Sequence, residues 1–124
     1  MRNIDKFRGC LIGGAAGDAL GYEVEFKREG TIFSEYGEEG ISKYDLILDT
    51  DVAEISDDTQ MTLFTAEGLL LAGSKDDNIG YINHIRNMYK CWYQTQSEQY
   101  PVQDEKQLSR LMSVPEYFTE DVRE

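Results

Sequence analysis

The sequence has few cysteines, histidines and prolines, and it has no long apolar run. Cys10 and Cys91 are its only cysteines, and neither has a second Cys or His at metal-ligand spacing. This pattern argues against a disulfide framework or a zinc site and is typical of buried thiols in a cytoplasmic protein. No stretch approaches the roughly 18 uninterrupted apolar residues of a spanning helix. Asp18 and the abundant glycines around it argue against a signal peptide.

Basic residues are also scarce. The 124 residues hold 12 Lys and Arg against 24 Asp and Glu, which gives a net charge of −12. This balance argues against nucleic acid or an anionic membrane surface as the general partner. Residues 35–58 contain nine acids and one base. Such a block is either a solvated loop or a group of carboxylates that a hard divalent cation neutralises.

Apolar spacing predicts helices in three parts of the chain. Residues 3–20 and 79–95 have apolar side chains at helical intervals, and residues 59–73 are apolar on most of the helix circumference. The last pattern predicts a buried helix that ends at Gly73. The length of the chain fits one small domain, residues 1–124.

The segments outside these helices have weaker patterns. Residues 22–58 lack helical periodicity and are expected to be mostly loop, with one short strand where Tyr44, Leu46 and Leu48 alternate. Residues 98–124 are expected to be weakly ordered, with one short helix before Pro115. The predicted fold class is therefore all-α, with a long acidic loop and one short strand.

Four glycines in the first predicted helix follow at steps of four: Gly9, Gly13, Gly17 and Gly21. They share roughly one helix face. Each interior glycine costs about 1 kcal/mol relative to alanine, so the stripe makes sense if another helix or a ligand approaches the backbone closely. The alternative is a flexible, turn-rich segment.

Ser56, Asp57 and Asp58 come just before the buried helix. One explanation is capping, in which Asp57 or Asp58 caps the helix and Gln60 completes a capping box with Asp57. The other is that the three oxygen side chains bind Mg²⁺ or Mn²⁺. Three ligands are too few for octahedral coordination, so waters, substrate or another segment would supply the rest.

Glu25 follows the glycine-rich helix and alternates with Val24 and Phe26. In an extended segment its carboxylate would leave a partly apolar wall, where it can serve as a general acid or base. A solvent-facing loop glutamate is the alternative.

Three segments carry a resemblance to a known family. GCLIGGAAGDALGYEVEF at 9–26, SDDTQMTLFTAEGLL at 56–70 and MYKCWYQT at 88–95 together resemble the ADP-ribosylglycohydrolase family, in particular the dinitrogenase-reductase-activating type of ADP-ribosyl hydrolase. LMSVPE at 111–116 also looks like bacterial members. The resemblance covers the N-terminal portion of the family. It implies an all-α hydrolase with two metal ions, usually Mg²⁺ or Mn²⁺, that cleaves the bond between ribose C1 of ADP-ribose and an acceptor side chain.

The resemblance also implies roles for individual residues. Ser56, Asp57 and Asp58 match the N-terminal metal ligands of the family, with Ser in place of the usual Thr. Glu25 matches the glutamate that activates water or assists proton transfer, and Asp18 matches a position that supports the structure or the ligands. The implied partners are ADP-ribose or an ADP-ribosylated protein, with the acceptor undefined.

The chain departs from the family pattern in one respect. Members carry a second acidic motif, Asp-x-Asp followed by Thr or Ser, and neither Asp104-Glu105 nor Glu120-Asp121 matches it. We therefore expect a truncated domain with half of the metal site, weak metal binding, exposed apolar faces that favour self-association, and marginal stability. The alternatives are a non-catalytic module that binds ADP-ribose or a partner helix, and an acidic helical domain whose SDDT segment is only a cap.

Overall fold

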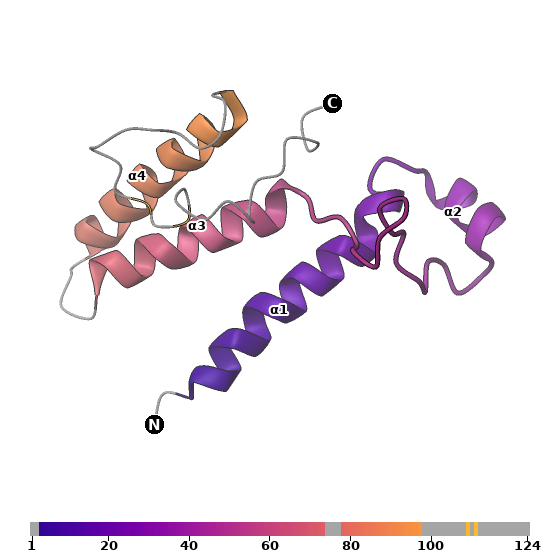
Figure 1. Ribbon diagram of the computed structural model, residues 1–124, viewed down its shortest axis with the longest axis horizontal. Helices are drawn as coiled ribbons and strands as arrows, with labels where there is room; N and C mark the ends of the chain where they lie inside the picture. Colours follow the sequence, from indigo (N-terminus) through magenta and orange to yellow (C-terminus); the bar gives the residue numbers. More distant parts are fainter. Residues whose placement is uncertain (1–2, 74–77, 98–108, 110, 112–124) are drawn as a thin grey trace. The chain divides into compact units, whose positions relative to one another are not determined.

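A computed structural model describes residues 3–73, 78–97, 109 and 111 of the chain. The described part is all-α, as predicted (Figure 1). Its helices are α1 (Ile4–Gly21), the short 3₁₀ helix η1 (Tyr22–Val24), α2 (Glu29–Tyr36), α3 (Asp57–Ala72) and α4 (Asn78–Ser97). None of these helices is long and apolar enough to cross a membrane. Asp104-Glu105, Glu120-Asp121 and the short helix expected before Pro115 lie outside the described residues.

The chain forms two compact units, residues 1–60 and residues 61–124. The first contains α1, η1, α2, the loop that follows α2 and the start of α3. The second contains the rest of α3 together with α4. Each unit is described by itself.

Helix α1 begins where Asn3 caps it, because the Asn3 Oδ1 accepts a 2.9 Å hydrogen bond from the backbone N–H of Asp5. Ala19 is the one buried residue of α1. The stripe of glycines lies in open space within this unit, since a Cβ added at Gly9, Gly13, Gly17 or Gly21 meets nothing within 4 Å. The segment is helical rather than turn-rich, and no described residue of the first unit packs against these four glycines.

The segment from 22 to 58 is more ordered than its sequence pattern predicts. It contains η1 and the two-turn helix α2, which ends at Gly37 with a φ of +84°. The short strand expected around 44–48 is a single antiparallel bridge between Leu46 and Ala53. A tight turn joins the two bridge residues, and Asp49 occupies its left-handed position with a φ of +62°.

The second unit packs α3 against α4. Its core is formed by Phe64 and Met88, each 1% exposed, with Cys91, Trp92 and Leu111 packed against them. A Cβ added at Gly68 would lie 2.9 Å from the Cα of Ile85. This glycine therefore allows the close approach of the two helices.

Hydrogen bonds add to the apolar contacts of the second unit. The hydroxyls of Thr65 on α3 and Tyr89 on α4 share one at 2.8 Å. Tyr81 on α4 donates another, at 2.7 Å, to the carbonyl of Gly73. Buried Ser109 donates at 2.5 Å to the carboxylate of Glu67 on α3.

Helix α3 ends as predicted at Gly73, whose φ is +70° and whose N–H donates to the carbonyl of Leu69. The prediction that α3 is buried around most of its circumference is wrong for its last turns. Leu70 is 82% exposed, and Leu69 and Leu71 are also exposed. The prediction of two buried thiols is also wrong, since Cys10 is exposed and Cys91 is half-buried, both as free cysteines.

Candidate active site

Asp18 links α1 to the start of α3. Its carboxylate accepts hydrogen bonds from Ser56, at 2.9 Å from the backbone N–H and 2.6 Å from the hydroxyl. It also accepts from Thr59, at 3.3 Å from the backbone N–H and through a short contact from the hydroxyl. These contacts fix the start of α3 to one side chain near the end of α1.

The four hydrogen bonds decide the protonation state of Asp18. Desolvation by burial raises the pKa of its carboxyl, but the hydrogen bonds from Ser56 and Thr59 outweigh it and leave the pKa below the usual value of 3.8. Asp18 is therefore a carboxylate at neutral pH.

Ser56 is the residue that caps α3. Its side-chain oxygen accepts a 3.1 Å hydrogen bond from the backbone N–H of Asp58, and its carbonyl accepts one from the N–H of Gln60. The prediction that Asp57 or Asp58 caps the helix, with Gln60 closing a capping box on Asp57, is therefore wrong. The cap lies one residue earlier, at Ser56, and Asp57 and Asp58 belong to the first turn of the helix.

Asp57 and Asp58 occupy the first turn of α3, and both are exposed. The positive end of the helix dipole favours two carboxylates there. With the hydroxyl of Ser56, which is buried at 8% exposure, they offer three oxygen donors of the type that Mg²⁺ and Mn²⁺ prefer. The part of the chain that the structure covers has no group of three or more His, Cys, Asp and Glu suited to a metal ion. A cation at this point would therefore complete its coordination with water or substrate.

Glu25 is placed differently from what its sequence suggests. It is the C-cap of η1, in helical rather than extended conformation, and its N–H donates to the carbonyl of Tyr22. The expectation of an extended segment with an apolar wall is therefore wrong. Glu25 is exposed, and within the described part of the chain it forms no hydrogen bond with Ser56, Asp57 or Asp58.

The hydroxyl of Tyr22 is influenced by the charges of both Glu25 and Asp18. Desolvation raises the pKa of its hydroxyl, and the charges of Glu54, Glu25, Asp18 and Glu23 raise it further. The negative charges of Glu25 and of Asp18, which binds Ser56, therefore both act on the hydroxyl of Tyr22. No local pattern selects Tyr22, Glu54 or Thr59, because their proximity depends on how the loop returns to the end of α1.

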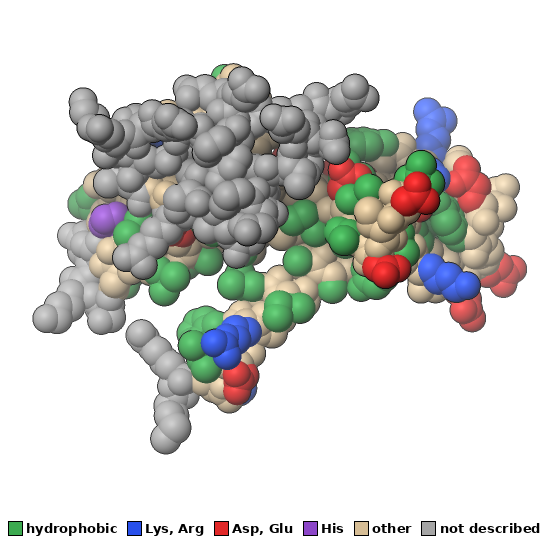
Figure 2. All heavy atoms as spheres, in the orientation of Figure 1, with side chains coloured by type: hydrophobic (Ala, Val, Ile, Leu, Met, Phe, Trp, Pro, Cys, Tyr) green, Lys and Arg blue, Asp and Glu red, His purple; other side chains and the backbone are tan. Residues whose placement is uncertain are grey.

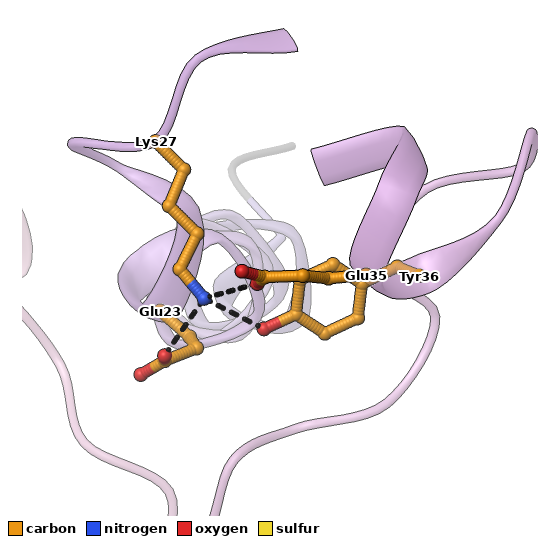
Figure 3. A network of polar contacts seen from close by, with 4 residues as sticks. All are labelled: Glu23, Lys27, Glu35 and Tyr36. Carbon is orange, nitrogen blue, oxygen red and sulfur yellow. Dashed lines mark hydrogen bonds and ion pairs between the residues drawn. The ribbon is translucent and has the colours of Figure 1, made fainter. Parts of the chain in front are cut away.

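Lys27 fixes the segment that carries Glu25. Its ammonium donates to Glu23 at 3.1 Å, to Glu35 at 2.7 Å and to the hydroxyl of Tyr36 at 3.2 Å, and it lies 5.2 Å from the Tyr36 ring centroid (Figure 3). Hydrogen bonds to Glu35, Tyr36 and Glu23 raise the pKa of Lys27. This network ties η1 to the end of α2.

A pocket of about 390 Å³ lies beside this network. Glu23 and Tyr36 contribute to its lining, together with residues 40–45 of the acidic loop. Acidic side chains are numerous on the part of the first unit that contains α2 and this loop (Figure 2). The pocket and the start of α3 both belong to the first unit, where most of the negative charge of the chain is found.

The fold and the site define an all-α protein with a carboxylate-rich centre built around the start of one helix. A family model described as ADP-ribosylglycohydrolase matches residues 1–118. The chain therefore belongs to the ADP-ribosylglycohydrolase family, as the sequence motifs indicated. Searches of curated proteins and of solved structures returned no match. The dinitrogenase-reductase-activating type within the family stays a prediction.

Proposed function

We propose that the chain takes part in metal-dependent hydrolysis of the glycosidic bond between ADP-ribose and an acceptor side chain. In this proposal Ser56, Asp57 and Asp58 bind Mg²⁺ or Mn²⁺, and Glu25 accepts a proton from the attacking water. The observation that carries the proposal is the double hydrogen bond from Ser56 to Asp18. It supports the proposal because it holds the buried Ser56 hydroxyl at the start of a helix whose first turn carries the exposed Asp57 and Asp58. Family membership supplies the reaction type.

Charge favours a cation at this site. Asp18, Asp57 and Asp58 bring three carboxylates to the start of α3, and the partial positive charge of the helix end offsets only about half of one. A divalent cation would relieve the remaining repulsion. Bound metal ions supply Lewis-acid stabilisation of the charge that develops as the bond to ribose C1 breaks.

Glu25 is suited to proton transfer because it is exposed at the end of a short helix that Lys27 holds in place. It would accept a proton from the attacking water, whose oxygen forms the new bond to ribose C1. The bonding pair of the broken bond leaves with the acceptor atom, which takes a proton to give the free side chain. The products are ADP-ribose and the unmodified acceptor.

The direct test is release of ADP-ribose from mono-ADP-ribosylated protein by the 124-residue chain, with Mg²⁺, with Mn²⁺ and with chelator. We expect metal-dependent release that Glu25→Gln reduces by about 10²-fold or more, the usual contribution of a general acid or base. Glu39→Gln is the matched control, because it removes an exposed glutamate of the acidic loop, and it should leave the rate unchanged. Release that is insensitive to chelator, or equally reduced by both variants, would contradict the assignment.

A second candidate function is a non-catalytic module that binds ADP-ribose or a partner helix. The exposed leucines of the last α3 turns, with Ile79 and Ile82 on α4, favour it because large exposed apolar groups mark interaction surfaces. The same surface is our basis for expecting self-association. Saturable ADP-ribose binding by folded chain without any turnover would select this candidate over the hydrolase. Both candidates keep the cytoplasm as the proposed compartment.

A further inference from the structure

Helix capping accounts for only part of the hydrogen bonding of Asp18. By accepting the N–H of Thr59, Asp18 satisfies one backbone donor in the first turn of α3. Ser56 already caps α3 by accepting from the N–H of Asp58, and a serine cap needs no carboxylate behind it. Asp18 nevertheless comes from another helix, 38 residues earlier, and takes the hydroxyl proton of Ser56 at 2.6 Å. Asp18 therefore also orients the side-chain oxygen of Ser56.

A serine hydroxyl has one proton and two lone pairs. In this structure the proton points to Asp18 Oδ1, and one lone pair accepts the N–H of Asp58. One lone pair therefore remains on Ser56 Oγ, and no proton can rotate in front of it. The negative charge of Asp18 behind the hydroxyl also polarises it, which makes the oxygen a better electron-pair donor.

The carboxylate of Asp18 is engaged with the start of α3. Of its roughly four lone-pair sites, one on Oδ1 accepts the hydroxyl of Ser56, and Oδ2 accepts three further hydrogen bonds. Its side chain is thus committed to Ser56 and Thr59.

We propose that Asp18 is a positioning residue that holds the hydroxyl of Ser56 in the orientation in which its free lone pair binds a divalent cation. The inference rests on the proposed metal site and deepens it. Asp18 acts through Ser56 and touches neither the cation nor the substrate. It makes metal affinity depend on a side chain of α1 as well as on the SDD segment of α3.

The test is Mn²⁺ affinity of the full 124-residue chain, measured by the electron paramagnetic resonance signal of free Mn²⁺, in a double-mutant cycle. Asp18→Asn should weaken Mn²⁺ binding about tenfold or more, the usual effect of removing a residue that supports a metal ligand. In the Ser56→Ala background the same change should weaken it less than about twofold, because the oriented hydroxyl is gone. An equal effect in both backgrounds would overturn the inference, since it would indicate a role of charge or general stability.

Two further variants keep the inference testable if Asp18→Asn fails to fold by circular dichroism. Thr59→Val removes one hydrogen bond to Asp18 but leaves both from Ser56, so Mn²⁺ affinity should stay within about threefold. Ser56→Thr retains a hydroxyl and should bind Mn²⁺ far better than Ser56→Ala. A loss in Thr59→Val as large as that in Ser56→Ala would overturn the inference. If the unaltered chain shows no saturable Mn²⁺ binding, the metal site itself fails, and the inference fails with it.

Discussion

Asp18 receives both the backbone N–H and the hydroxyl of Ser56, which joins the glycine-rich helix α1 to the start of α3. In the first unit this contact brings together residues that lie 38 positions apart. It places the SDD segment at a defined point instead of on a free loop. The candidate site therefore depends on the folding of the first unit.

The first unit should lose stability at acid pH, because protonation of the Asp18 carboxylate weakens its hydrogen bonds to the start of α3. The folded pKa lies below the usual value, so its contribution is fully present above the unfolded pKa and is lost as pH falls through the folded pKa. We expect Asp18→Asn to lower the free energy of unfolding by about 1–3 kcal/mol at pH 7. The difference from the unaltered chain should shrink below about pH 4.

Urea denaturation of both proteins between pH 7 and pH 2.5 measures this difference. Asp45→Asn, which removes an exposed loop carboxylate of the same unit, is the control and should change stability by less than about 0.5 kcal/mol. A difference between Asp18→Asn and the unaltered chain that stays constant down to pH 2.5 would exclude the hydrogen-bonded carboxylate as its origin.

Gly68 should tolerate no side chain. A Cβ there would lie 2.9 Å from the Cα and 3.1 Å from the N of Ile85, so backbone must move. We expect Gly68→Ala to destabilise the second unit by about 1–3 kcal/mol, measured by thermal denaturation followed by circular dichroism. An unchanged or raised midpoint would show that α3 and α4 are not in close contact at Gly68.

Gly17→Ala is the matched change in α1 and should have the opposite sign. A Cβ at Gly17 meets nothing within 4 Å, and alanine is the better helix former by up to about 1 kcal/mol. The midpoint should therefore rise. If Gly17→Ala lowers it instead, another helix or chain packs on the glycine stripe, as the sequence pattern first suggested.

Lys27 should stabilise the η1–α2 region through charge. Lys27→Met removes the ammonium from Glu23, Glu35 and Tyr36, and we expect faster proteolysis of the segment from 28 to 40. Because the pKa of Lys27 is raised, its contribution is fully present below its unfolded pKa of 10.5 and is lost only above it. The difference from the unaltered chain should therefore be constant from pH 6 to pH 9 and should diminish in 1 M salt. A salt-independent difference would indicate packing of the lysine stem as its cause.

The sequence predicted the elements with strong local signals. Helices α1, α3 and α4, the end of α3 at Gly73 and the all-α class were all expected and are confirmed. Helix α2 was missed because eight residues are too few for a clear period, and isolated helices of that length are marginal. Lys27 holds its last residues by contacts that no local pattern reveals.

The site was predicted in composition but not in arrangement. The motifs selected Ser56, Asp57, Asp58, Glu25 and Asp18, yet the capping residue and the conformation at Glu25 were both wrong. The hydrogen bonds from Ser56 to Asp18 are between distant positions, so propensity and spacing carry no information about them. In the same way, the glycine stripe predicted a close approach of another helix or a ligand at α1. The close approach of two helices occurs instead at Gly68 of α3.

The central claim is that a divalent cation binds at the start of α3, and Mn²⁺ titration of matched aspartate pairs tests it most directly. Asp57→Asn with Asp58→Asn removes both proposed carboxylate ligands. Asp49→Asn with Asp51→Asn removes two exposed acids from the loop turn of the same unit, where asparagine tolerates the left-handed conformation. We expect the first pair to weaken Mn²⁺ binding by more than about tenfold and the second by less than about threefold. Equal losses in the two pairs, or no saturable binding by the unaltered chain, would contradict it.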